Sequence, residues 1–174
     1  FFDEQGNRVR NGFFVFEDKY KGGDTIAHID MDGNGKRDLL LAHGAKLTAW
    51  RDDGQLLLQV YPYTANYTGK LRIAVGDIHH NNTKEIFVAP SAGYPAPIKV
   101  YNADGSSIKN DWFPYGAQYK GGYNITIANF GADLGNNVVV GSGVGKEPMV
   151  DIYDYAFNRI SGWRAFEPAF RGGI

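Results

Sequence analysis

The stretch Trp112-Phe-Pro-Tyr-Gly-Ala-Gln-Tyr-Lys-Gly-Gly122 occurs in this chain in four recognisable copies. The other three are Phe14-Val-Phe-Glu-Asp-Lys-Tyr-Lys-Gly-Gly23, Val60-Tyr-Pro-Tyr-Thr-Ala-Asn-Tyr-Thr-Gly69 and Arg164-Ala-Phe-Glu-Pro-Ala-Phe-Arg-Gly-Gly173. Their central aromatic residues stand 47, 52 and 51 residues apart, in the order Phe16, Tyr63, Tyr115 and Phe166. Self-similarity at such a period is typical of a propeller or a solenoid, because a single unit cannot bury its apolar face alone and packs on its neighbours.

Composition supports a packed domain and excludes several partners. The chain has 174 residues, of which 43% are hydrophobic and 14% aromatic, so it has ample material for a core. Its formal net charge of -1 argues against nucleic acid or an anionic membrane as a partner, since either favours a basic surface. No apolar run approaches the roughly 20 residues of a membrane span. The absence of Cys excludes disulfides and thiolate chemistry.

Short apolar runs bounded by Gly, Asp and Asn fill the sequence between the copies, and none is long enough for an ordinary helix. We therefore expect four strands in each of three units, at residues 25–29, 39–42, 47–50 and 56–60, then 71–75, 85–89, 98–101 and a strand ending at 113, then 124–128, 137–141, 149–153 and 160–164. Asp-Gly turns at Gly54 and Gly105 favour tight hairpins, and Phe157 takes the place of Gly in the third unit. Four antiparallel strands per unit predict a propeller blade.

The predicted fold class is all-β: a β-propeller segment with three full blades and an outer half-blade, in a single repeat domain. Its parts are the half-blade and connector at 1–23 and the blades at 24–69, 70–122 and 123–174. The half-blade follows from an alignment of residues 1–9 with residues 49–56, which are the third strand and turn of a blade. Because three and a half blades do not close a propeller of the usual four to eight, we expect flanking blades or self-association to complete it. The alternative is an open stack with ragged ends.

A nine-residue loop, Asp30-Met-Asp-Gly-Asn-Gly-Lys-Arg-Asp38, carries the strongest chemical motif of the chain. Oxygen atoms at its first, third, fifth and ninth positions, with a main-chain carbonyl at the seventh, can surround a hard cation that prefers six to eight oxygen ligands. The expected ligands are Asp30, Asp32, Asn34, Asp38 and the carbonyl of Lys36. Calcium is favoured over magnesium because these oxygens are many and flexible. The alternative is an Asp/Asn/Gly turn without a metal.

The corresponding loop of the second unit offers weaker ligands. Its candidates are Asp77, Asn81, Thr83 and Glu85. His79 stands at the third position, where a hard cation prefers oxygen to imidazole. In the third unit, residues 129–137 keep Asp133 as their only carboxylate. The falling number of carboxylates predicts a falling affinity, and metal binding by the second and third loops stays open.

A first strand, an Asp-x-Asp-x-Asn-Gly-x-x-Asp loop and an apolar second strand, repeated at blade length, resemble the FG-GAP and VCBS repeats of integrin-like propellers. Gly76-Asp77 and the recurring Lys/Arg-Gly-Gly are similar to the bacterial surface versions of that repeat. The resemblance covers essentially the whole chain. It implies a calcium-stiffened β-propeller for adhesion or ligand display, extracellular or at the cell surface. The metal residues carry over only to Asp30, Asp32, Asn34, Lys36 and Asp38.

No motif in the chain supports catalysis. Residues 141–147 look like a phosphate-binding loop, but Val140 stands where that motif needs Gly, and Glu147 stands where it needs Ser or Thr. The four His residues have no spacing suited to zinc, and His28 alternates within a strand as a packing residue would. The chain has no Gly-x-Ser-x-Gly, and its paired carboxylates occur only in the metal loop, where a cation would hold them ionised.

Aromatic residues recur in pairs four positions apart, beside Gly. The pairs are Phe16/Tyr20, Tyr63/Tyr67, Tyr115/Tyr119 and Phe166/Phe170. Recurrence at a fixed position predicts packing between adjacent blades. The rival interpretation is a sugar-binding shelf built from the unmatched aromatics Tyr61, Tyr94 and Trp163.

The sequence thus predicts a non-catalytic module whose partner is a protein or glycan ligand at the cell surface. Two alternatives differ in class. One is a carbohydrate-binding propeller, and the other is a non-catalytic segment of a larger secreted enzyme.

Overall fold

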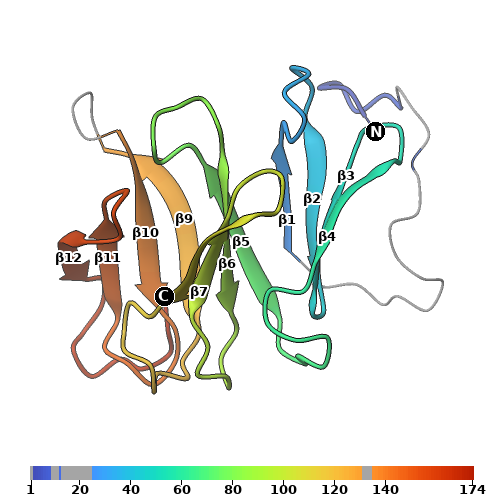
Figure 1. Cartoon of the computed structure of the whole chain (residues 1–174). Coiled ribbons are helices and arrows are strands. Elements are labelled where there is room, and N and C mark those ends of the chain that lie inside the picture. Colours follow the sequence, from blue (N-terminus) through green and yellow to red (C-terminus); the bar gives the residue numbers. More distant parts are fainter. Residues whose placement is uncertain (1, 9–11, 13–24, 131–134) are drawn as a thin grey trace.

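The computed structural model describes residues 2–8, 12, 25–130 and 135–174 (Figure 1). Within these residues the chain forms twelve strands and no helix, so the expected all-β fold is confirmed. The strands make three separate four-stranded antiparallel sheets, each in simple sequence order. No helix in this part of the chain is long and apolar enough to cross a membrane.

Each sheet is a meander of short strands. The first sheet contains β1 (Thr25–Ile29), β2 (Asp38–His43), β3 (Lys46–Trp50) and β4 (Leu56–Val60). The second contains β5 (Leu71–Gly76), β6 (Glu85–Pro90), β7 (Ile98–Tyr101) and β8 (Ser107–Trp112). The third contains β9 (Tyr123–Asn129), β10 (Asn136–Ser142), β11 (Met149–Tyr153) and β12 (Arg159–Arg164). These bounds agree with the expected strands to within one or two residues.

Equivalent tight turns join the third and fourth strands of the sheets. The turn residue has positive φ in all three, at 93° in Gly54, 84° in Gly105 and 65° in Phe157. A side chain is strained in this left-handed region, which Gly adopts freely. The ring of Phe157 lies 5.1 Å from that of Trp112, between centroids, so a contact with the neighbouring sheet compensates for the strain.

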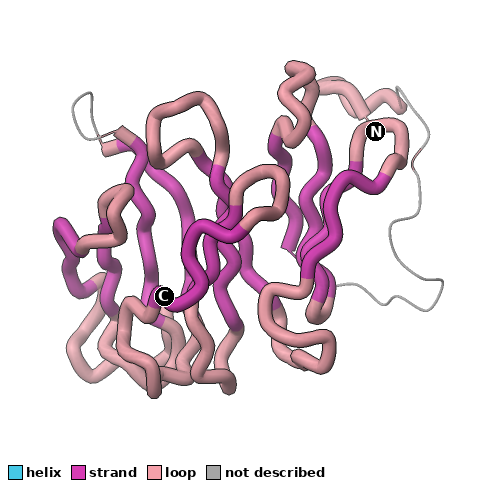
Figure 2. Tube along the Cα trace, viewed as in Figure 1, coloured by secondary structure: helices cyan, strands magenta, loops and turns pink. Residues whose placement is uncertain are grey.

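The core lies between the sheets. One buried cluster joins the first sheet to the second, through residues such as Leu40 and Ile86, and another joins the second to the third, through Phe87 and Val138. The first strands of the sheets are neighbours, since β5 contacts both β1 and β9. Figure 2 shows the resulting row of strand groups, with loops at both ends. Each sheet therefore buries its faces only against another sheet.

Tyrosines in the connectors fasten each sheet to the next. The hydroxyl of Tyr63 donates to the carbonyl oxygen of Pro97 at 2.7 Å, and that of Tyr115 donates to Val140 at 3.0 Å. Their rings pack on Tyr67 and Tyr119, with centroids 4.9 and 5.3 Å apart. The expectation that these pairs pack between units is confirmed.

Of the first and last aromatic pairs along the chain, only the last lies within the described residues. Phe166 and Phe170 contact each other at 5.2 Å between centroids but are exposed. The Phe16/Tyr20 pair lies outside the described residues, as does most of the half-blade expected at 1–17. Of that half-blade, residues 2–8 form an isolated antiparallel bridge between Phe2 and Arg8.

His28 does not pack in the sheet, so that expectation is wrong. Its side chain is exposed on β1 and lies beside the guanidinium of Arg37, with Nη1 3.2 Å from Nε2. Alternation places His28 and Ile26 on one face of β1, and both are exposed on that face.

Gly122 marks a close approach between two main chains. Its φ is +74°, and a Cβ at this position would lie 2.5 Å from the main-chain nitrogen of Ala92. The main-chain N–H of Gly143 donates to the carbonyl of Gly122 at 3.0 Å, which holds the connector against the third sheet. The second Gly of this Gly-Gly pair is therefore required by space as well as by conformation.

We expect Gly122→Ala to destabilise the protein more than Gly116→Ala. Gly116 also has positive φ, +89°, but nothing lies within 4 Å of its would-be Cβ. Gly116→Ala should therefore cost only the left-handed strain of about 1–2 kcal/mol, whereas Gly122→Ala adds a steric clash of roughly 1–3 kcal/mol. Urea denaturation of both variants measures the difference, and equal losses would contradict the close approach.

Candidate metal centre

Three carboxylates converge in the β1–β2 loop, at the upper end of the first sheet in Figure 1. One carboxylate oxygen from each of Asp30, Asp32 and Asp38 lies within 4.8 Å of the other two. Ile29 and Asp38 pair directly across β1 and β2. The loop therefore begins and ends at a regular pair of the antiparallel sheet. The sequence-predicted carboxylate ligands are thus brought together.

Asp30 organises the backbone of this loop. Its Oδ1 accepts the main-chain N–H groups of Gly33 and Asn34 at 2.8 and 3.1 Å, and its Oδ2 accepts that of Gly35 at 2.9 Å. Asn34 in turn accepts the N–H of Lys36 at 2.8 Å through its Oδ1. Asn34 and Lys36 therefore form the turn itself, as Asx turns do.

Asp38 supplies the observation that favours a cation. The residue is 1% exposed, and its Oδ2 accepts the N–H of Met31 at 2.9 Å. Its Oδ1 is buried and has no hydrogen-bond partner among the described residues. Burial raises the pKa of Asp38, and the negative charges of Asp32 and Asp30 act in the same direction. A buried acceptor without a donor costs about 1–3 kcal/mol, and a bound cation would remove that penalty.

Arg51, on the β3–β4 turn, is a participant that the sequence did not reveal. Its Nη2 lies 2.7 Å from Oδ2 of Asp32, and its Nη1 donates to Oε1 of Gln55 at 2.6 Å. The hydrogen bond from Arg51 lowers the pKa of Asp32. The other oxygen of Asp32 accepts only a long bond, 3.3 Å, from the N–H of Asn34. Arg51 thus holds Asp32 through Oδ2.

The β5–β6 loop repeats the same backbone. Asp77 accepts the N–H groups of Asn81 and Asn82 at 3.2 and 2.9 Å, as Asp30 does in the first loop. Asn81 accepts the N–H and the hydroxyl of Thr83 at 2.9 and 2.6 Å. Glu85 is 1% exposed and stands in register with Asp38, since Gly76 pairs with Glu85 as Ile29 pairs with Asp38.

The donor groups of the second loop differ from those of the first. Oε2 of Glu85 accepts the N–H of Ile78 at 2.9 Å, while Nδ1 of His79 lies 3.1 Å from Oε1. Both oxygens of this buried carboxylate are therefore partnered. Among the described residues, the convergent group of possible metal ligands lies in the first loop alone. Metal binding by the second loop stays a prediction.

In the β9–β10 loop the ninth position holds Asn137, which pairs with Ala128 as Asp38 pairs with Ile29. Asn137 is buried, and its Oδ1 has no partner among the described residues. Asp133 lies outside the described residues. A neutral amide thus fills the place of the Asp38 carboxylate.

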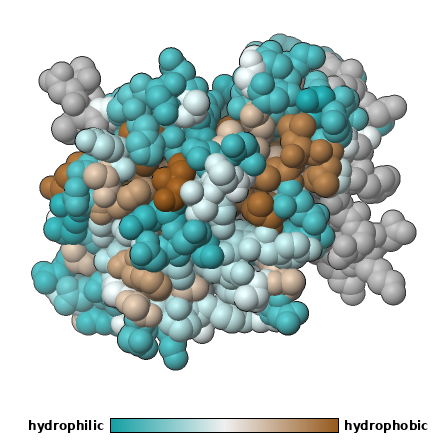
Figure 3. Space-filling model, viewed as in Figure 1, coloured by the Kyte–Doolittle hydropathy of each residue, from teal (hydrophilic) through white to brown (hydrophobic). Residues whose placement is uncertain are grey.

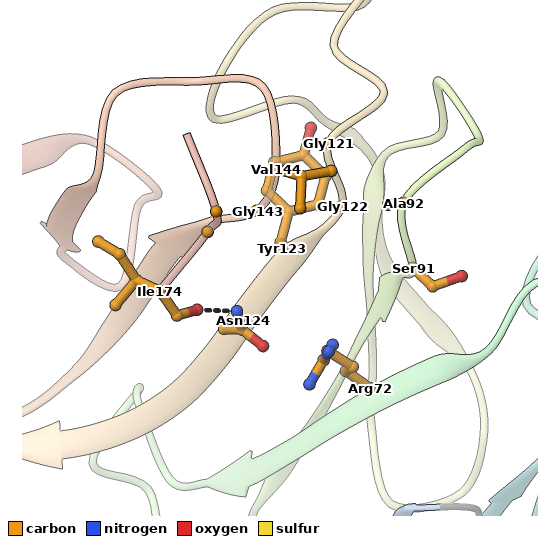
Figure 4. A pocket seen from close by; sticks show the side chains of 12 residues that line it. Arg72, Ser91, Ala92, Gly121, Gly122, Tyr123, Asn124, Gly143, Val144 and Ile174 are labelled. Carbon is orange, nitrogen blue, oxygen red and sulfur yellow. Dashed lines mark hydrogen bonds between the residues drawn. The ribbon is translucent and has the colours of Figure 1, made fainter. Parts of the chain in front are cut away.

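A cavity of about 260 Å³ lies at the other end of the sheets, near the starts of β5 and β9 (Figure 4). Arg72 and Asn124 lie on either side of it, and Asn124 donates a hydrogen bond to the carbonyl of Ile174. Ser91 also lines the cavity, where its Oγ accepts the N–H of Lys70 at 2.9 Å. Arg72 is the only charged side chain among its lining residues, so the cavity offers Ser91 no general base.

Comparisons with known proteins give no match: no family model, no curated protein and no solved structure matches this chain. The resemblance to FG-GAP and VCBS repeats therefore stays a hypothesis that rests on the motif and its geometry.

We expect Asp38→Asn to be at least as stable as the unmodified protein in chelator at neutral pH, because it removes a buried charge and copies the natural Asn137. The raised pKa means that the folded state binds the proton of Asp38 more readily than the unfolded state does. The stability contributed by Asp38 is therefore present below its ordinary value of 3.8 and is lost as the pH rises through the raised pKa. The gap between the two proteins should close on acidification.

Urea denaturation in chelator, from about pH 7 to about pH 4, tests this prediction. Asp53→Asn, on the exposed β3–β4 turn, is the matched control for the loss of one carboxylate. An Asp38→Asn protein that is less stable at every pH would show that the carboxylate is favourable without a metal.

Proposed function

We propose that the three sheets are consecutive blades of a β-propeller, and that calcium binding in the first loop stiffens the blade that carries it. The protein then acts as a non-catalytic module that presents its loops to a ligand, outside the cell or at its surface. The observation that carries the proposal is the buried, unpartnered Oδ1 of Asp38 beside Asp30 and Asp32.

The arrangement of the sheets supports the propeller. In a propeller, four-stranded meanders stand around an axis with their first strands innermost. Here β5 contacts both β1 and β9, and the fourth strand lies at the far edge of each sheet. The repeated tyrosine contacts join each sheet to the next in the same way.

One face of the third sheet is exposed to solvent. This exposure favours the proposal that further blades complete the propeller. Trp112 of the second sheet is 6% exposed in the contact with the third, whereas Trp163, its counterpart in β12, is 48% exposed. Ile78 and its counterpart Phe130 differ in the same way, at 0% and 46%. Flanking blades or self-association would cover this face.

The donor set of the first loop suits calcium. Three carboxylates and a neutral amide oxygen are the hard ligands that calcium prefers, and the main-chain carbonyl of Lys36 is the further candidate. The proposed metal residues are Asp30, Asp32, Asn34, Lys36 and Asp38. Bound calcium would supply positive charge to the unpartnered oxygen of Asp38 and fix the loop between β1 and β2.

A protein ligand is the partner that the surface favours. Apolar side chains gather over β4 on the face shown in Figure 3, where Leu56 is exposed. Exposed apolar patches of this kind mark interaction sites in many proteins. The glycan alternative gains no comparable support, because Tyr61 follows β4, Tyr94 lies in the β6–β7 loop and Trp163 lies on β12. The ring of Tyr94 also packs on that of Tyr67, 4.7 Å between centroids.

Thermal unfolding with calcium and with chelator tests the proposal. A metal that binds only the folded state stabilises it, by about 2.7 kcal/mol when its concentration is 100 times Kd. We expect calcium to raise the Tm of the unmodified protein and of Asp53→Ala, and to leave the Tm of Asp32→Ala unchanged. A Tm that does not respond to calcium in the unmodified protein would refute the metal centre.

A further inference from the structure

We infer that His79 is the residue that makes the second loop independent of metal, because its imidazole takes the place of the cation. The chain then carries one metal loop and one metal-free loop with the same backbone. This inference rests on the proposed metal centre in the first loop and defines how many ions the first two loops take.

The two loops share most of their hydrogen bonds between side chains and the main chain. The carboxylate at the first position accepts the N–H groups of the fifth and sixth residues in both, and Asp30 also accepts that of Gly33. The Asn at the fifth position accepts the N–H of the seventh residue in both. The carboxylate at the ninth position accepts the N–H of the second residue at 2.9 Å in both. Positive φ occurs at the fourth and sixth positions, in Gly33 and Gly35 and in His80 and Asn82. The loops therefore differ in chemistry and not in backbone.

The decisive difference lies between the third and ninth positions. In the first loop Asp32 and Asp38 are both acceptors, and Oδ1 of Asp38 has no donor among the described residues. In the second loop Nδ1 of His79 lies 3.1 Å from Oε1 of the buried Glu85, so the imidazole is the group that faces this oxygen. A cation is needed where acceptors face each other, and it is redundant where a donor faces an acceptor.

Contacts with the third sheet also hold the second loop. Nδ2 of Asn136 donates to the main-chain carbonyl of Asp77 at 2.7 Å. The rings of His79 and Tyr155 meet edge to face, 6.1 Å between centroids. A carbonyl that accepts from Asn136 and an imidazole that packs on Tyr155 are already engaged, so this loop has fixed neighbours without an ion.

Counting bound calcium by isothermal titration and native mass spectrometry tests the inference. We expect one ion per chain in the unmodified protein and two in His79→Asp, which restores an oxygen at the third position. His80→Asp is the matched control: it makes the same change of side chain one residue later, at a position with φ of 55° that Asp tolerates, and it should leave the count at one.

The reciprocal variant places the His and Glu of the second loop, His79 and Glu85, at the same positions of the first loop. Asp32→His combined with Asp38→Glu should reduce the count by one and leave the Tm insensitive to calcium. Hydrogen exchange needs no variant: calcium should slow exchange of the amides in residues 30–38 of the unmodified protein and leave those in residues 77–85 unchanged.

The outcomes separate this inference from the proposed function. Calcium-dependent protection of residues 77–85 in the unmodified protein, or no gain of an ion in His79→Asp, would overturn it. A count of zero in the unmodified protein with one in His79→Asp would refute the metal centre of the first loop and still support the role of His79. As a check on folding, His79→Ala should lower the urea midpoint in chelator, because it removes the imidazole that faces Oε1 of Glu85.

Discussion

Each sheet of this protein buries its apolar residues against a neighbouring sheet. A four-stranded meander has two faces and little interior, so residues such as Leu40 and Phe87 are buried only because another sheet lies against them. The connectors follow from the same constraint. Tyr63 and Tyr115 reach across to the next sheet, and Gly122 lets two main chains approach closely.

The loops gain their geometry from this framework. Because each first strand pairs with its second strand in the same register, Asp38, Glu85 and Asn137 occupy one structural position in three sheets. Chemistry at that position can then vary while the backbone stays the same. An Asp with an unpartnered oxygen, a Glu beside His79 and a neutral Asn fill it in turn, so one fold accommodates loops of different chemistry.

Much of the strand pattern can be read from the sequence, because short apolar runs between Gly, Asp and Asn have few other folds open to them. The positive φ of Phe157 follows from its alignment with Gly54. Contacts made across the sheet are harder to foresee. Arg51 reaches Asp32 from a turn nineteen residues away, and alternation alone could not tell which face of β1 is covered, so His28 was misassigned.

The pairing of His79 with Glu85 also bears on how such arrays diversify. Codons for histidine and aspartate differ in one base, so under the proposed role of His79 a single point mutation would separate an ion-dependent loop from a self-sufficient one. Neighbouring repeats can therefore drift between the two states independently. A lineage that moves from calcium-rich to calcium-poor surroundings would retain its fold by accumulating such exchanges, one repeat at a time.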